Sequence, residues 1–301
     1  MVFNKYRRIA ENLKVCSLEE AEKNLLNLDP RNLEALEGFY NVYRKDWDLR
    51  VNGLNIVGTG GDGKNTFNIS TAAAFVCAAA GIPVVKFGNR SATSKSGSVD
   101  FLQTLNISLS KTPDEVLINL DRANIAFISA QEVYPIFRRF STIRKKITVP
   151  TIFNYLGPLL NPVDTSLTVL GVSRPDMATI YTGFLEKIKR NGVVLTSNGF
   201  DEAIPFQLTE VYYCSRKQEI LPNKTGRLED LAIASPEQSA KIILDIFEGK
   251  DKSVRYDCVA LNAGIAIAYY NKIDFDDGIR IAKNTINSKK AHKTLKKCQL
   301  L

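Results

Sequence analysis

Short apolar runs alternate with amphipathic segments from about residue 54 onward. Runs rich in Val, Ile and Leu, bounded by glycine or polar residues, predict buried strands. Such runs lie at 54–57, 84–86, 125–128, 168–171 and 193–196, and a β-rich stretch with alternating side chains lies at 211–214. Helical spacing predicts helices at 71–80, 98–105, 113–121, 133–143, 175–190 and 236–247. This alternation predicts an α/β fold, in which helices cover a parallel or mixed sheet.

The two ends of the chain are predicted to be helical. Residues 1–53 lack β-branched runs and carry Leu, Ala, Glu and Lys at helical spacing. Ser17 and the Asp29-Pro30 pair are expected to begin two of these helices. We therefore predict a small helical subdomain over 1–53, to which a later helical segment can belong, and an α/β domain over 54–301. Near the C-terminus, the apolar run 257–270 predicts a buried helix, and a final amphipathic helix is expected to begin at Asp276.

The segment 58–71, GTGGDGKNTFNIST, has the composition of an anion-binding loop. Its four glycines let the backbone approach a ligand, and an alanine-rich helix with free N-terminal amides follows. Neither GxxxxGK[ST] nor GxGxxG with an acidic partner is present, which argues against a common nucleotide site. Asp62 would repel a bare phosphate but fits a ribose hydroxyl or a metal-bound pyrophosphate. The loop therefore predicts a sugar phosphate with Mg²⁺, whereas the simpler alternative is a structural turn before a core helix.

A second polar loop follows the predicted strand 84–86. Lys86, Asn89, Arg90 and Lys95 lie there among serines and glycines. Open α/β sheets bind ligands at the carboxyl ends of their strands, so both loops are expected to bind one polyanion. An ordinary solvated loop is the alternative.

Adjacent carboxylates follow the predicted strand 193–196. Asp201 and Glu202 would lie at the same edge of the sheet as the two loops. Oxygen ligands suit hydrated Mg²⁺ shared with substrate phosphates. A solvated acidic pair is common, so the magnesium prediction depends on the phosphate loops.

Composition excludes several classes of protein. The 301 residues are 45% hydrophobic and 24% charged, which is typical of a globular protein. No apolar run approaches the roughly 20 residues of a membrane span, and no signal-peptide core is present, so a cytoplasmic location is expected. Five cysteines without CxxC spacing indicate reduced thiols rather than a zinc site. His292 is the only histidine, which excludes histidine-based catalytic triads.

The positive charge fits more than one kind of partner. The net charge is +8, and several lysines lie in a C-terminal tail that is expected to be solvated and frayed. A basic chain can bind nucleic acid, but it also suits an enzyme whose substrate carries several phosphates.

Five ordered motifs resemble the anthranilate phosphoribosyltransferase family. They are 58–71, KFGNRSATSKSGS at 86–98, TIFNYLGPLLNP at 151–162, the Asp201-Glu202 pair, and DCVALNAGIAIAYY at 257–270. The resemblance implies a small helical domain joined to a large mixed-sheet α/β domain of the nucleoside phosphorylase type, usually in a homodimer. It further implies transfer of the phosphoribosyl group of phosphoribosyl pyrophosphate to the nitrogen of anthranilate, with release of pyrophosphate, in tryptophan biosynthesis.

The same resemblance implies the site residues. Those expected to bind phosphoribosyl pyrophosphate are Gly58, Gly61, Asp62, Thr66, Asn68, Ile69, Ser70, Thr71, Lys86, Gly88, Asn89, Arg90, Ser94 and Ser98. Those expected to contact anthranilate are Gly58, Asn89 and Arg144, and those expected to bind Mg²⁺ are Ser70, Asp201 and Glu202. No general base is implied, since positioning and electrostatics stabilise the departing pyrophosphate.

The chain departs from the family on the acceptor side. Phe87 and the segment around Tyr134 lack histidines that the family has, and Pro150 stands where members often have arginine. Phosphoribosyl transfer to a different aromatic acceptor is therefore one alternative. A non-catalytic nucleic-acid-binding homologue of the same fold is another, and a nucleoside phosphorylase is a weaker third.

Overall fold

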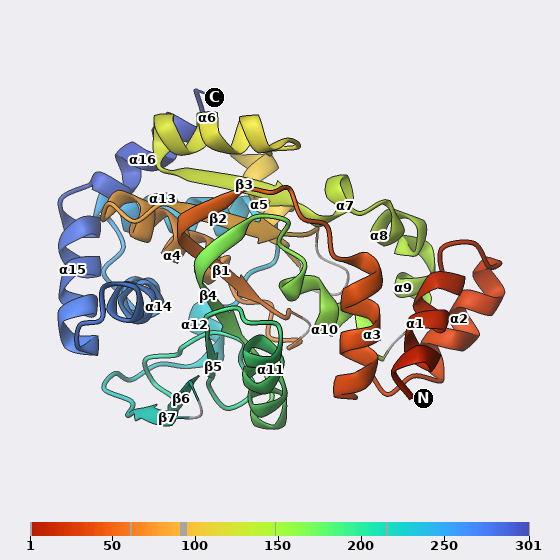
Figure 1. Cartoon of the computed structure of the whole chain (residues 1–301). Coiled ribbons are helices and arrows are strands. Elements are labelled where there is room, and N and C mark those ends of the chain that lie inside the picture. Colours follow the sequence, from red (N-terminus) through yellow and green to blue (C-terminus); the bar gives the residue numbers. More distant parts are fainter. Residues whose placement is uncertain (1, 61, 91–94, 148, 215, 301) are drawn as a thin grey trace.

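A computed structural model describes residues 2–60, 62–90, 95–147, 149–214 and 216–300 (Figure 1). Its centre is a seven-stranded sheet with the order β3-β2-β1-β4-β5-β6-β7. The strands are β1 (Arg50–Gly58), β2 (Val84–Gly88), β3 (Ile125–Ser129), β4 (Asp164–Gly171), β5 (Gly192–Thr196), β6 (Thr209–Tyr213) and β7 (Arg216–Ile220). The first five pair in parallel and the last two antiparallel, so the predicted α/β fold with a mixed sheet is confirmed.

Adjacent residues of the central strands enter two separate apolar cores. Ile56 and Val84 point into one core, while Val57 and Val85 point into the other. This follows from the period of two in a strand, and it requires helices on both faces of the sheet. The near-continuous apolar sequence of these strands is typical of that arrangement.

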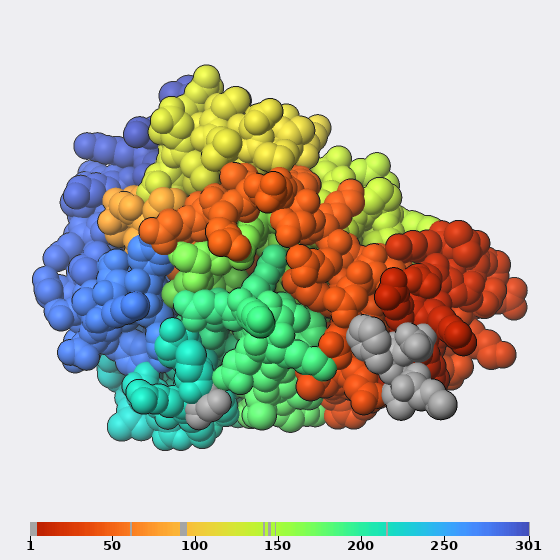
Figure 2. All heavy atoms as spheres, viewed as in Figure 1, coloured from red at the N-terminus to blue at the C-terminus, as the bar shows by residue number. Residues whose placement is uncertain are grey.

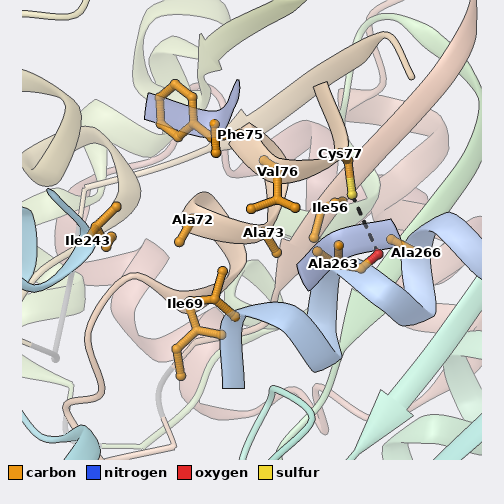
Figure 3. Close-up of a cluster of buried hydrophobic side chains, with 14 of the residues drawn as sticks. Ile56, Ile69, Ala72, Ala73, Phe75, Val76, Cys77, Ile243, Ala263 and Ala266 are labelled. Atoms are coloured by element: carbon orange, nitrogen blue, oxygen red, sulfur yellow. Dashed lines mark hydrogen bonds between the residues drawn. The ribbon is translucent and has the colours of Figure 1, made fainter. Parts of the chain in front are cut away.

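The first core lies between the sheet and a layer made of the C-terminal helices and the two helices that follow β1 and β2. Its helices are α4 (Ile69–Ala79), α5 (Ser98–Thr104), α12 (Leu228–Leu231), α13 (Pro236–Glu248), α14 (Val254–Asn271), α15 (Phe275–Asn287) and α16 (Lys290–Cys298). The alanine faces of α4 and α14 pack closely, and the Cys77 thiol lies 3.7 Å from the carbonyl of Ala263 (Figure 3). Small side chains allow this close approach. Packing against α14 therefore fixes the position of α4, which begins where the phosphate loop ends.

The second core joins the N-terminal helices to the opposite face of the sheet. Its helices are α1 (Val2–Asn12), α2 (Leu18–Leu26), α3 (Leu33–Tyr43), α6 (Pro113–Ala123), α7 (Ala130–Val133), α8 (Pro135–Arg139), α9 (Ser141–Lys146), α10 (Ile152–Leu156), the 3₁₀ helix η1 (Gly157–Leu159) and α11 (Pro175–Lys187). In the space-filling view, the N-terminal helices in red and the C-terminal helices in blue lie at opposite ends of the molecule (Figure 2).

Four local predictions need correction. The range 133–143 is not one helix, because Pro135 forces the preceding Tyr134 into an extended conformation and separates α7 from α8. The strand β7 was not predicted, since its sequence RKQEI is mostly exposed and has no apolar pattern. The lysine-rich tail is not frayed: it forms α16, which packs Ala291, Leu295 and Cys298 into the first core.

The fourth correction concerns a helix start near the N-terminus. Ser17 caps α2 as predicted, accepting a hydrogen bond of 3.1 Å from the amide of Glu20. Asp29-Pro30, however, does not begin α3, whose N-cap is Asn32 with a 2.9 Å bond from the amide of Ala35. The division of the chain at residues 53 and 54 stays a prediction. Among the helices of the described residues, none is both long and apolar enough to cross a bilayer.

Candidate active site at the carboxyl ends of the parallel strands

The polar loops meet in one cavity of about 200 Å³ at the carboxyl ends of the parallel strands. Most predicted site residues line it: Gly58, Asp62, Thr66, Asn68, Ser70, Thr71, Lys86, Gly88, Asn89, Arg90, Ser98, Asp201 and Glu202. Ile69 does not, because its side chain is fully buried in the first core (Figure 3). Gly61 and Ser94 lie outside the described residues, as does the side chain of Arg144. The structure therefore brings three segments of the sequence to one place.

The phosphate loop ends where α4 begins. Gly60 and Gly63 have φ of +64° and +71°, which is the left-handed region that glycine enters without strain. Asn68 occupies the N-cap position of α4 without a side-chain cap bond, and Ser70 and Thr71 lie in the first turn. The Thr71 hydroxyl is buried and has no hydrogen-bond partner among the described residues. The amides of Asn68 and Thr71 already have partners, so the helix dipole and the hydroxyls are what make this end of α4 suitable for a phosphate.

Lys86 brings a buried positive charge to the same place. Its ammonium donates to the carbonyl of Ile56 at 2.5 Å and to the hydroxyl of Ser70 at 3.2 Å. Burial lowers the pKa of Lys86 to about 8, although Glu202 and Asp201 act in the opposite direction. A cation fixed under the phosphate loop is suited to neutralise a polyanion.

Three carboxylates face one another across the cavity. Oxygen atoms of Asp62, Asp201 and Glu202 lie within 4.8 Å of one another. Asp201 accepts a 2.6 Å hydrogen bond from the amide of Gly60, and Asp62 accepts one of 3.0 Å from the amide of Lys64. The second oxygens of Asp62 and Glu202 are buried without a hydrogen-bond partner among the described residues.

The electrostatics of these carboxylates favour a bound cation. Burial, followed by the charge of Asp62, raises the pKa of Asp201 to about 7. Burial and the charge of Asp201 raise the pKa of Glu202 well above its ordinary value, and burial also raises that of Asp62. Unpaired oxygen atoms in a crowded anionic cluster fit a hard divalent cation such as Mg²⁺.

Two glycines let the acidic pair reach the end of the sheet. A Cβ atom on Gly58 would lie 2.4 Å from a carboxylate oxygen of Asp201. A Cβ atom on Gly171 would lie 1.7 Å from the carbonyl oxygen of the same residue. Gly58 is therefore required for the cavity's shape, apart from any contact that it makes with a substrate.

An aromatic wall closes the other side of the cavity. Phe137 and Phe153 line it, and their rings meet edge to face with centroids 5.6 Å apart. Phe87 also lines the cavity, and its buried ring packs at 90° against that of Tyr134 with centroids 6.0 Å apart. The Tyr134 hydroxyl donates to the carbonyl of Leu160 at 2.6 Å. Two of the three places at which the sequence departs from the family thus form a packed aromatic pair beside an apolar surface suited to a flat ring.

Part of this arrangement was indicated by the sequence. Asp62 was expected beside a ribose hydroxyl or a metal-bound pyrophosphate, and the structure places it in the acidic cluster with Asp201 and Glu202. Ser70 was expected to bind the metal, and the structure places its hydroxyl 3.2 Å from the Lys86 ammonium. The aromatic wall was not predicted: Phe153 lies in the motif 151–162 but was not singled out, and Phe137 lies in an apolar segment that gave no signal.

Comparison with known proteins defines the class. Residues 50–292 match the family model described as glycosyl transferase family, a/b domain, and this range is most of the chain. The chain therefore has the fold of a glycosyl transferase of this family.

Individual relatives narrow the identification. Anthranilate phosphoribosyltransferase from Staphylococcus haemolyticus is 41% identical over 248 residues, which cover 78% of this chain and 73% of the relative. The crystal structure of the Thermus thermophilus anthranilate phosphoribosyltransferase has 30% identity and a TM-score of 0.86, covering 99% of this chain and 94% of that one. The Saccharomyces cerevisiae enzyme in complex with PRPP and Mg has 26% identity and a TM-score of 0.88, covering 98% and 91%. The chain belongs to the anthranilate phosphoribosyltransferase family.

Proposed function

We propose that this protein transfers the phosphoribosyl group of phosphoribosyl pyrophosphate to the amine of anthranilate and releases pyrophosphate, as a step of tryptophan biosynthesis. The main support is the convergence of the phosphate loop, Lys86 and three carboxylates on one cavity beside an aromatic wall. The names of the relatives agree with this activity.

The cation of this site is proposed to be Mg²⁺. Asp201 and Glu202 would hold it, with Asp62 as a third carboxylate and Ser70 as the ligand that the family resemblance adds. Bound there, Mg²⁺ would supply positive charge to the oxygen atoms of the pyrophosphate. This assignment fits the two buried carboxylate oxygens that lack a partner among the described residues.

The remaining chemistry is assigned to the protein itself. The dipole of α4 and the ammonium of Lys86 stabilise negative charge on the pyrophosphate as the C1–O bond breaks. The bonding electrons leave with the pyrophosphate, and C1 gains positive character. The amine of anthranilate has a free lone pair, so it forms the new C1–N bond without a general base to activate it, and the protonated nitrogen then loses one proton to the released pyrophosphate or to water. Phe137 and Phe153 would orient the aromatic ring toward C1.

The acceptor side carries three further assignments. Gly58 and Asn89 line the cavity where anthranilate is expected. Arg144 is proposed to face the carboxylate of anthranilate, on the basis of the family resemblance.

A homodimer in the cytoplasm is also proposed. The N-terminal helices expose several large apolar side chains, among them Leu18, Leu26 and Leu33, with 47%, 52% and 37% of their surface exposed. A second copy of the chain would cover them.

The activity is tested by the loss of anthranilate fluorescence in the presence of phosphoribosyl pyrophosphate and Mg²⁺. Turnover is expected for the natural chain and is expected to vanish in the double variant Asp201→Ala/Glu202→Ala with the fold intact by circular dichroism. Asp276→Ala/Asp277→Ala is a matched control, because this adjacent acidic pair lies in the first turn of α15 outside the cavity. Equal turnover in both double variants contradicts the metal assignment.

The same assay separates the alternatives. A nucleic-acid-binding homologue would consume no anthranilate and would bind DNA or RNA with strong salt dependence. The three carboxylates in the cavity argue against that function, because they would repel a phosphate backbone. An enzyme with a different acceptor would release pyrophosphate only when another aromatic amine replaces anthranilate.

A further inference from the structure

The phosphate loop is fixed by a side chain from a distant helix. Ser239 on α13 is fully buried, and its hydroxyl accepts a 2.9 Å hydrogen bond from the amide of Asn68. The same hydroxyl donates to the side-chain oxygen of Asn68 at 2.7 Å. That oxygen also accepts a 2.8 Å bond from the hydroxyl of Ser96 in the second loop. Ser239 does not line the cavity, yet it holds the residue that joins the two loops.

The acidic pair is fixed in a similar way from α14. The side-chain oxygen of Asn262 accepts a 3.0 Å bond from the amide of Ala203, and its nitrogen donates to the carbonyl of Ala203 at 2.7 Å. A third bond of 2.8 Å runs from this nitrogen to the carbonyl of Cys258. Ala203 is fully buried, so Asn262 supplies the partners that its two backbone groups need. Glu202 is the preceding residue, and its direction therefore depends on this clamp.

We propose that Ser239 and Asn262 are positioning residues, through which the C-terminal helices separately set the donor-phosphate loop and the metal carboxylates. The proposal rests on the function proposed above. Binding a polyanion or a divalent cation requires groups placed to within a fraction of an ångström, and a fixed geometry removes the cost of ordering them upon binding. Each clamp joins segments far apart in the sequence, by 171 positions for Ser239 and 59 for Asn262. The two contacts act on different parts of the site, so their effects are separable.

For the first clamp, Ser239→Ala is expected to weaken pyrophosphate binding and to raise KM for phosphoribosyl pyrophosphate, each by roughly tenfold, because one buried hydrogen-bond network is lost. Affinity for Mg²⁺ is expected to change little. Ser110→Ala is the matched control, because Ser110 is also buried, accepts a 2.9 Å bond from the side-chain nitrogen of Asn119, and lies outside the cavity. This control is expected to lower stability without changing KM.

For the second clamp, Asn262→Asp keeps the size of the side chain but places an oxygen against the carbonyls of Ala203 and Cys258. It is expected to weaken Mg²⁺ binding by roughly tenfold or more while KM for phosphoribosyl pyrophosphate at saturating Mg²⁺ changes less. Asn262→Ser is the second variant, which carries no buried charge and keeps one hydroxyl.

Isothermal titration calorimetry with pyrophosphate and with Mg²⁺ measures both affinities without turnover. A donor-specific loss in Ser239→Ala and a metal-specific loss in the Asn262 variants support the proposal. Unchanged affinities in folded variants overturn it, and so does an equal loss of both affinities in every variant, which indicates a general loss of structure. If the natural chain binds neither pyrophosphate nor Mg²⁺, the proposed function itself is wrong.

Discussion

At the scale of single residues, the acidic cluster is the feature that conflicts most with stability. Asp62, Asp201 and Glu202 are crowded together, and two of their oxygens lack partners among the described residues. Burial raises the pKa of each group, so the charged forms of these carboxyls are less favourable in the folded chain than in the unfolded chain. Residues that bind ligands are often placed at such a cost to the fold.

A single amide substitution tests this conflict. Glu202→Gln removes a buried ionisable group, and it is expected to raise the free energy of unfolding of the metal-free protein by roughly 0.5–2 kcal/mol while lowering turnover. Urea unfolding without Mg²⁺ measures the first effect, and the anthranilate assay measures the second. Glu229→Gln on the exposed surface of α12 is the control, for which little change is expected. A less stable Glu202→Gln protein would show that the buried Glu202 carboxyl does not lower the stability of the metal-free fold.

The sequence predicts the role of site residues where all of them lie in one short segment. Glycines, hydroxyls and a helix start in one segment indicate an anion site without knowledge of the fold. The meeting of Asp62 with Asp201, and of Asn68 with Ser239, depends on how distant segments fold together. The first of these neighbourhoods was expected only as far as the loops and the acidic pair were predicted at the same edge of the sheet. Nothing in the sequence around Ser239 indicated its contact.

At the scale of elements, α14 and α15 pack closely against each other through glycines. A Cβ atom on Gly264 would lie 2.7 Å from the Cα atom of Ile279, and one on Gly278 would lie 2.2 Å from the carbonyl oxygen of Gly264. Glycine at both positions lets the two helices approach, and α14 in turn packs against α4. The long apolar helix was predictable from its Ala- and Gly-rich sequence, but its partner helix was not. At Pro135 the sequence did contain a local signal for a break, but the helical spacing over 133–143 led to the prediction of a single helix.

Two glycine-to-alanine substitutions are expected to have opposite effects. Gly264→Ala would force α14 and α15 apart and lower the free energy of unfolding by roughly 1–3 kcal/mol. Gly183→Ala on the exposed face of α11 meets no atom within 4 Å, and it is expected to raise that free energy by about 0.5–1 kcal/mol. Urea unfolding of both variants measures the difference. Similar effects of the same sign would show that helix propensity alone decides.

At the scale of the whole molecule, the site is a junction between distant parts of the chain. The phosphate loop, the acidic pair and the two helices that clamp them come from opposite halves of the sequence. The alternation of elements predicted a parallel or mixed sheet covered by helices, but it did not predict the order of the strands. The order itself, and the docking of α16 into the first core, result from packing that no local pattern encodes.

Ligand binding is therefore expected to stabilise the entire fold. With Mg²⁺ and pyrophosphate at about 100 times the dissociation constant, linkage adds roughly 2.7 kcal/mol, which corresponds to a rise in Tm of about 5 °C for a chain of this size. Thermal unfolding followed by circular dichroism measures this shift. The double variant Asp201→Ala/Glu202→Ala is expected to lose the part of the shift that depends on Mg²⁺. An unchanged shift in that variant would place the cation elsewhere.

The span of these clamps also bears on how the protein is made. A ribosome completes the phosphate loop long before it reaches Ser239, which comes 171 residues after Asn68. Until then α4 has no α14 to cover its alanine face, and the contact from Cys77 to Ala263 spans 186 residues. Contacts of such long range form slowly and leave apolar surface exposed in the nascent chain. The growing polypeptide therefore lacks both clamps, and leaves the alanine face of α4 uncovered, until the C-terminal helices emerge.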